Sequence, residues 1–150
     1  MIILQNPSNK GKTSVLSHLA YYLKNNSTNP QVIEGSLQLP DYSINKYSIN
    51  NFLFTCIIKS KKIAIVSMGD NHLLKKKIDL INKDKDIDIL FGACRSQGIT
   101  VKIINEEAKK YNAHLILTST YKTNTRTSRE DLNKIKADEL FRLLDYLKIV

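Results

Sequence analysis

The segment from Asn6 to Thr13, which reads NPSNKGKT, places a glycine, a cation and a hydroxyl next to one another in the order that anion binding requires. A phosphate-binding loop needs a strand that ends abruptly, backbone amides that point inward, and a helix whose N-terminus receives the anion. Gly11 leaves the backbone uncrowded near phosphate oxygens, Lys12 supplies a long cationic side chain, and the hydroxyl of Thr13 suits Mg²⁺. The segment therefore predicts a site for phosphate groups and a magnesium ion.

This segment resembles the Walker A motif of P-loop NTPases, G-x-x-x-x-G-K-[ST], with one departure. Asn6 stands where the first glycine is usual, and because Asn tolerates left-handed backbone geometry, the departure is interpreted as mild. The alternative is a strand–turn–helix corner whose Lys12 is only solvated. The resemblance implies binding of Mg²⁺ and a nucleoside triphosphate, ATP by preference because no guanine motif is found. The residues implied to bind the nucleotide are Asn6, Ser8, Asn9, Lys10, Gly11, Lys12, Thr13 and Ser14.

A second segment, IAIVSMGD, is an apolar run followed by an acid, Asp70. It resembles the Walker B element, in which a carboxylate holds Mg²⁺ directly or through water. The resemblance implies that Thr13 and Asp70 hold the metal, with Ser67 as a weaker outer ligand. The alternative is that Asp70 caps the N-terminus of the helix that follows it.

Arg95 follows the strand expected over residues 87–92. In a parallel sheet this position lies on the carboxyl edge, the edge that also carries the loop after the first strand. A guanidinium there could neutralise charge on a transferring phosphoryl group, and the alternative is an exposed loop arginine. The predicted catalytic residues are therefore Lys12, Asp70 and Arg95.

Two classes of function stay open. The first is an enzyme, a P-loop NTPase or small kinase that hydrolyses the nucleotide or transfers its phosphoryl group. Asn71 follows Asp70, where RecA-like and AAA-type ATPases usually carry a catalytic Glu, so the subfamily is not assigned. The second class is a catalytically weak interaction module, in which the nucleotide gates a partner or nucleic acid. The lack of a visible base favours this module or a very slow enzyme. Residues 26–50 would act in it as a lid or switch. The phosphoryl acceptor and the protein partner are not predicted.

Strand and helix patterns alternate along the chain and predict a three-layer α/β fold like that of P-loop NTPases. The sheet is expected to be mostly parallel, with one antiparallel hairpin strand and helices on both faces. The expected strands span 2–5, 52–58, 62–67, 87–92 and 114–119, and the expected helices span 13–23, 71–82, 99–111 and 127–147. Only three residues join the second and third strands, which forbids a parallel crossover.

Two further segments are interpreted from local signals. Residues 26–50 are rich in Asn and Ser and lack a sustained period, so we expect a long loop with short strands at most around 31–33 or 36–39. Thr127 and Glu130 form a capping-box pattern at the start of the last helix.

Composition bounds the class of protein. The chain has 150 residues, 42% hydrophobic and 25% charged, which predicts one globular domain over residues 1–150. Apolar runs are too short for a bilayer or a signal peptide, so a cytoplasmic chain without a membrane partner is expected. The net charge of +9 favours polyanions, but the scattered lysines without interleaved aromatic residues support nucleic-acid binding only weakly. Cys56 and Cys94 are expected to be buried thiols.

Overall fold

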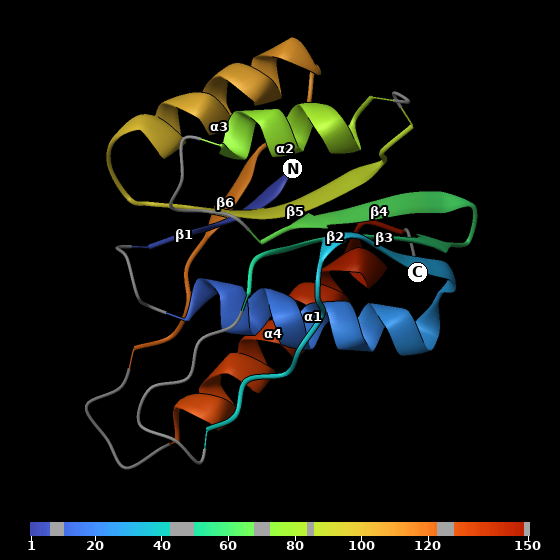
Figure 1. Cartoon of the computed structure of the whole chain (residues 1–150), viewed down its shortest axis with the longest axis vertical. Helices are drawn as coiled ribbons and strands as arrows, with labels where there is room; N and C mark the ends of the chain where they lie inside the picture. Colours follow the sequence, from blue (N-terminus) through green and yellow to red (C-terminus); the bar gives the residue numbers. More distant parts are fainter. Residues whose placement is uncertain (7–10, 43–49, 68–72, 84–85, 123–127, 149–150) are drawn as a thin grey trace.

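The described part of the chain forms a mixed six-stranded sheet and four helices, shown from the side in Figure 1. The computed structural model describes residues 1–6, 11–42, 50–67, 73–83, 86–122 and 128–148. The strands are β1 (Ile2–Gln5), β2 (Thr28–Gly35), β3 (Phe52–Ile58), β4 (Lys61–Val66), β5 (Ile89–Cys94) and β6 (Ile116–Thr118). The helices are α1 (Lys12–Asn26), α2 (Leu74–Ile81), α3 (Ile99–Lys110) and α4 (Arg129–Tyr146).

The strands lie in the order β2-β3-β4-β5-β1-β6, and β4, β5, β1 and β6 run parallel to one another. β3 runs antiparallel to both β4 and β2. The hairpin between β3 and β4 turns at Lys59 and Ser60, whose φ angles of 46° and 67° are the two positive values of a type I′ turn. The expected hairpin and the α/β class are thus confirmed.

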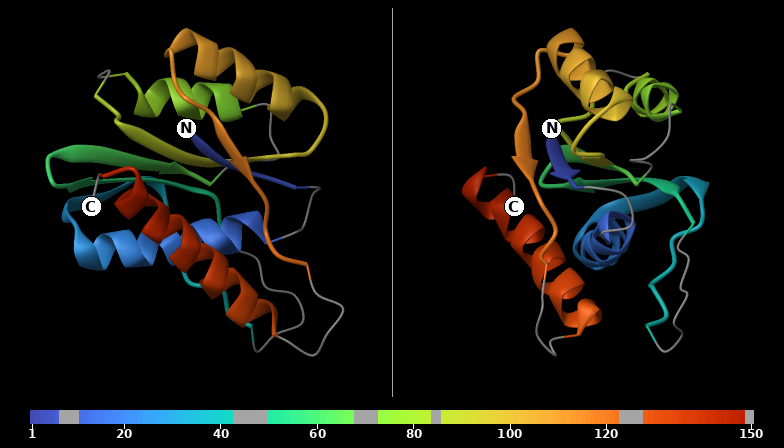
Figure 2. Two further views of the ribbon diagram at one scale, coloured as in Figure 1. Left: turned by 180° about the vertical axis from the view of Figure 1, so that it is seen from behind. Right: turned by 90° about the vertical axis from the view of Figure 1, so that its left-hand side faces the viewer.

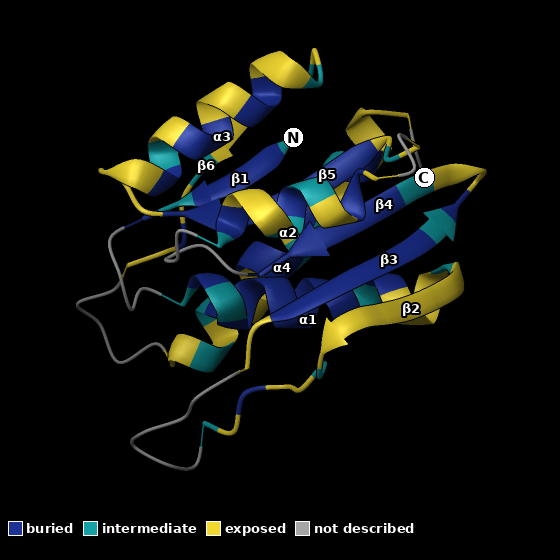
Figure 3. Ribbon diagram, turned by 45° about the horizontal axis from the view of Figure 1, so that its top comes forward, coloured by how far each residue is buried: buried dark blue, intermediate teal, exposed yellow. Residues whose placement is uncertain are grey.

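Helices cover both faces of the sheet, with α2 and α3 on one side and α1 and α4 on the other (Figure 2). Alternate side chains of β1 follow this division: Ile2 and Leu4 pack in the core beneath α1 and α4, whereas Ile3 packs toward α2 and α3. The strands in the middle of the sheet are therefore buried on both faces, and the outer helix surfaces are exposed (Figure 3). No helix in the described ranges is long and apolar enough to cross a membrane.

β2 occupies part of the segment that was expected to be mainly loop. All eight of its residues are exposed, and it pairs with β3 at the edge of the sheet. Its side chains therefore show no alternation of buried and exposed positions, which is the signal that reveals a half-buried strand. The expected short strand around 31–33 falls inside β2, whereas 36–39 lie in no helix or strand.

Several boundaries differ from the expected ones; for example, the strand expected over 114–119 is limited to Ile116–Thr118. β5 spans Ile89–Cys94 rather than 87–92. Just before it, Asp88 is held to Lys62 by two hydrogen bonds: its carboxylate accepts from the Lys62 N–H at 2.8 Å, and its own N–H donates to the Lys62 carbonyl at 2.9 Å. The cap of α4 is Ser128, whose Oγ accepts from the Asp131 N–H at 3.1 Å. The predicted capping residue Thr127 lies outside the described residues.

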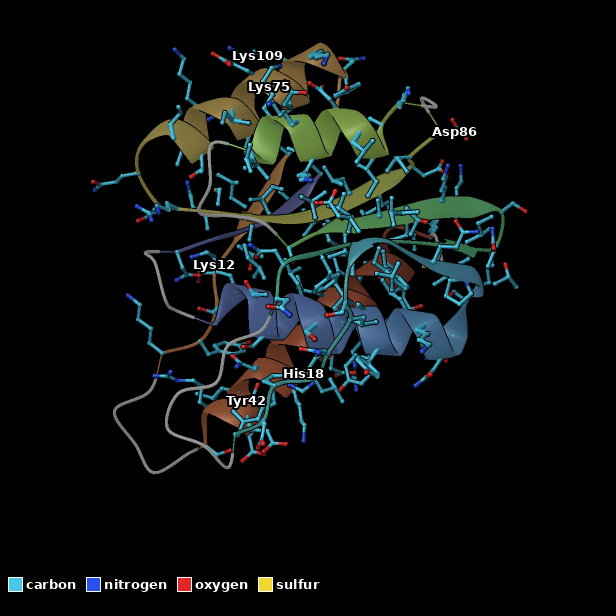
Figure 4. The ribbon with its side chains drawn as sticks, in the orientation of Figure 1. Lys12, His18, Tyr42, Lys75, Asp86 and Lys109 are labelled. Carbon is cyan, nitrogen blue, oxygen red and sulfur yellow. The ribbon has the colours of Figure 1, made fainter. Side chains whose placement is uncertain are left out.

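Charged side chains join α2 to α3 on the outer layer. The carboxylate of Glu107, 1% exposed, accepts a 2.7 Å hydrogen bond from Lys75 (labelled in Figure 4) and lies 3.5 Å from Lys110. Lys110 also binds Asp79 at 2.5 Å, and this contact, together with a hydrogen bond from Tyr111, lowers the pKa of the Asp79 carboxyl. Glu107 is therefore the buried carboxylate of this charged group, and both Lys75 and Lys110 contact it.

Replacing Glu107 by Ala should lower the free energy of unfolding by about 2 kcal/mol, since hydrogen bonds to charged groups contribute about 1.5–3 kcal/mol. Glu106→Ala is the matched control, because the neighbouring Glu106 is 55% exposed and faces Lys102 at 3.8 Å. Urea denaturation measures both variants. Equal stabilities would show that the buried carboxylate does not hold α2 against α3.

Candidate functional site

The carboxyl ends of β1 and β5 form a topological switch point of the sheet. The chain leaves β1 toward α1 on one face and leaves the neighbouring β5 toward α3 on the other face (Figure 1). The Asn6 N–H donates to the Cys94 carbonyl at 3.3 Å, so the two strand ends are joined directly. Ligands of open α/β sheets bind outside the carboxyl ends of strands at such a point.

Lys12 lies at this point with its side chain in the interior. It begins α1, is 5% exposed, and its Nζ donates to the Asn6 carbonyl oxygen at 3.2 Å (Figure 4). The ammonium therefore reaches back from the helix to the end of β1. A buried ammonium is costly unless it is paired with hydrogen-bond acceptors, and the Asn6 carbonyl oxygen is one such acceptor.

Gly11, the residue before α1, has a backbone conformation that favours glycine. Its φ of 79° lies in the left-handed region, and a Cβ there would stand 2.9 Å from Oδ1 of Asn133 on α4. The helix after it has no side-chain cap and no acid in its first turn. Its N-terminal N–H groups and the positive end of its dipole are thus not neutralised by its own first-turn residues. Thr13 and Ser14 follow in that turn, half-buried and buried respectively.

Asn6 has a different role from the one interpreted from sequence. It is absent from the residues with positive φ, so its backbone is not left-handed. Its side chain is used instead: Oδ1 accepts from the Thr120 N–H at 2.7 Å and from the Thr120 hydroxyl at 3.2 Å. Asn6 therefore ties the end of β1 to the chain after β6, a contact that glycine could not make.

Two other predicted residues lie on the same edge. Arg95 is the first residue after β5 and is exposed, and its backbone N–H donates to the Thr100 hydroxyl at 3.0 Å, which holds the turn into α3. Ser67 follows β4, but its buried hydroxyl accepts from the Phe52 N–H at 2.7 Å. The oxygen of Ser67 thus serves the β3–β4 contact, and the interpretation as an outer metal ligand finds no support in its surroundings.

The rest of the predicted set cannot be placed: Ser8, Asn9, Lys10 and Asp70 lie outside the described residues. In the described ranges, no three His, Cys, Asp or Glu side chains gather into a group that could hold a metal ion. A magnesium ion that arrives with a nucleotide needs fewer protein ligands, because it keeps several waters and binds the phosphates.

Tyr42 and Asn133 are site neighbours that sequence reasoning missed. The Tyr42 hydroxyl accepts from Asn133 Nδ2 at 3.0 Å and lies 3.1 Å from Nε2 of His18 on α1 (His18 and Tyr42 are labelled in Figure 4). Burial, followed by the charge of Lys134, lowers the pKa of His18, so its ring is neutral at pH 7. Through Asn133, the segment that carries Tyr42 is linked to Gly11.

No protein-family model, curated protein or solved structure matches the chain. Its function is therefore inferred from its own residues. Those that the structure brings together at the switch point are Asn6, Gly11, Lys12, Thr13, Ser14 and Arg95.

Asn6→Ala should lower the free energy of unfolding by about 2 kcal/mol, because the buried N–H of Thr120 loses this acceptor. The matched control is Asn105→Ala on the exposed face of α3, where the side chain only donates to the Val101 carbonyl at 3.0 Å. Thermal and urea unfolding measure the difference. A loss no greater than that of the control would contradict the bridging role of Asn6.

Proposed function

We propose that the chain binds a nucleoside triphosphate, ATP by preference, with Mg²⁺ at the carboxyl edge of β1, and hydrolyses it or transfers its terminal phosphoryl group. The buried ammonium of Lys12 is the strongest support. It is held at the start of a 15-residue helix and points back to the strand end. This cation, the helix N-terminus without a side-chain cap or a first-turn acid, and the lack of a Cβ at Gly11 fit a chain of phosphate oxygens.

The metal part of the proposal rests on Thr13. Its hydroxyl lies in the first turn of α1, beside Lys12, and is a hard oxygen donor of the kind that Mg²⁺ prefers. Asp70 is the second proposed ligand, by its resemblance to the Walker B acid. Bound Mg²⁺ would neutralise phosphate charge and orient the phosphates. Lys12 would bind the terminal phosphate oxygens in the same arrangement.

Arg95 is the proposed stabiliser of developing charge. It follows β5, the strand that lies between β1 and β4, so it occupies the edge beside the end of β1. Phosphoryl transfer proceeds mainly through positioning and charge stabilisation, and a guanidinium at this edge would serve the second purpose. His18 is of a residue type that can act as a general base, but its Nε2 lies 3.1 Å from the Tyr42 hydroxyl.

A second function, the nucleotide-gated interaction module, is favoured by one contact chain. Tyr42 binds Asn133, and Asn133 packs against Gly11 at the proposed phosphate loop. A nucleotide that repositions Gly11 could therefore bias the segment that carries Tyr42. Phosphate release separates the two functions: turnover of Mg·ATP selects the enzyme, and tight binding without turnover selects the module.

Lys12→Ala should raise the Kd for Mg·ATP about 10- to 100-fold, the loss expected for one charge-assisted hydrogen bond to phosphate. Isothermal titration calorimetry measures the affinity, and circular dichroism checks that the variant is folded. Lys109→Ala is the control, because Lys109 is an exposed lysine on α3 far from Lys12 (Figure 4). An unchanged affinity in folded Lys12→Ala would refute nucleotide binding at this loop.

Thr13→Ala tests the metal separately. The wild-type affinity for ATP should fall when EDTA removes Mg²⁺, whereas the affinity of the variant should depend less on the metal, because one of the two proposed protein ligands is gone. Thr13→Ser keeps the hydroxyl and should keep the Mg²⁺ dependence. If Thr13→Ala keeps the full dependence, the hydroxyl of Thr13 does not hold the ion.

A further inference from the structure

A groove of about 630 Å³ runs between β6 and α4, at the edge of the sheet opposite β2. Figure 2 shows the two elements side by side, with β6 in orange and α4 in red. Most of the lining is apolar, from residues on both elements and on the chain after β6: Ile116, Leu117, Tyr121, Ile135, Leu143 and Tyr146.

The apolar residues of this groove are unusually accessible. Tyr146 is 86% exposed, Ile135 53% and Leu117 49%. Single exposed apolar side chains are ordinary, but a contiguous set in a groove marks an interaction surface. Among the described strands, β6 is the last of the sheet and pairs with β1 alone, so the groove borders an edge of the described sheet.

The groove face of α4 has a self-complementary order of residues. Ile135, Asp138, Arg142 and Tyr146 follow one another at spacings of three, four and four, which places them on one stripe of the helix. Asp138 and Arg142 form an ion pair of 2.8 Å at the centre, and the apolar residues stand at the two ends. In the opposite direction along the helix, the order is apolar, cation, anion, apolar, so an antiparallel copy of the stripe places each charge opposite one of the other sign.

We propose that this groove binds the same groove of a second copy of the chain, through antiparallel contact of the two α4 helices across a twofold axis. In that arrangement Asp138 of each copy faces Arg142 of the other, and Ile135 faces Tyr146. A twofold contact requires such reciprocity, because residue i meets residue j and residue j meets residue i. A parallel arrangement places like charges together and is disfavoured.

Charge distinguishes a second copy from other occupants. The charged residues of α4 that line the groove are two acids, Asp138 and Glu139, and one base, Arg142. The buried Lys136 lies beside the groove and offsets the charge of Glu139 through a 2.7 Å hydrogen bond. The chain as a whole has a net charge of +9. This face is therefore balanced and does not attract the polyanions that the remaining surface would attract, whereas its alternating charges suit a partner with the same pattern.

Sedimentation equilibrium of the full chain from micromolar to submillimolar concentration tests the proposal. The wild type should approach the dimer mass as concentration rises, and Ile135→Asp should stay monomeric. The single reversals Asp138→Arg and Arg142→Asp should each raise the dimer Kd about tenfold or more, because each puts like charges opposite one another. The double variant should recover the wild-type Kd, since both opposite-charge contacts are restored.

The matched control is the reversed pair Glu130→Lys with Lys134→Glu. These residues form an ion pair with the same i,i+4 spacing on α4 but lie outside the groove lining, so the dimer Kd should not change. Circular dichroism confirms that each variant is folded, and all altered side chains are exposed or partly exposed. A wild type that stays monomeric at every concentration overturns the proposal, whether a small ligand or another protein fills the groove. So does a dimer that tolerates Ile135→Asp, or a double variant that stays as weak as the single ones.

Discussion

Lys12 carries its ammonium into the interior at the end of β1, and the rest of the candidate site is arranged around that cation. A buried ammonium needs oxygen atoms close to it, and the Asn6 carbonyl supplies one at 3.2 Å. Gly11, directly before α1, has a φ of 79°, in the left-handed region that favours glycine. Asn133 of α4 then packs against Gly11 where a side chain would otherwise stand. β1, α1 and α4 thus meet next to this buried charge.

The parts of the fold that the sequence predicted are those whose signal is local. The apolar stripe of α1 predicts a helix from its spacing alone, independently of the tertiary fold. Its residues Leu16, Leu19 and Leu23 are all fully buried. The three-residue connection expected between the second and third strands predicts a hairpin from its length alone, and in the structure the turn is two residues long, Lys59 and Ser60. β2 gave no such signal, because an exposed edge strand is defined by the backbone of its neighbour rather than by its own side chains.

The candidate site divides in the same way. The order Gly11-Lys12-Thr13 after an apolar strand is a local pattern, and it predicted the helix start and the cation. The role of Asn6 depends on Thr120, which is 114 positions away, and the contact between Tyr42 and Asn133 spans 91 positions. A single sequence contains no sign of contacts at such separations, since they depend on how the strands are ordered. Asn6 was therefore assigned a backbone role although its side chain makes the contact.

β6 connects the two proposals physically. Its carboxyl end leads to Thr120, which binds Asn6 at the proposed phosphate site, and its Thr118 hydroxyl accepts a 2.8 Å hydrogen bond from Lys136 of α4 beside the groove. A three-residue strand depends strongly on such side-chain contacts, because its own ladder to β1 is short. Occupancy of one site can alter the other only if β6 has two arrangements with different affinities. The hydrogen bonds of Thr118 and Thr120 fix the carboxyl end of β6, and the Ile116 N–H donates to the Met1 carbonyl at 2.8 Å at its other end. These contacts favour a single arrangement of the strand, so we expect the two proposed sites to bind independently.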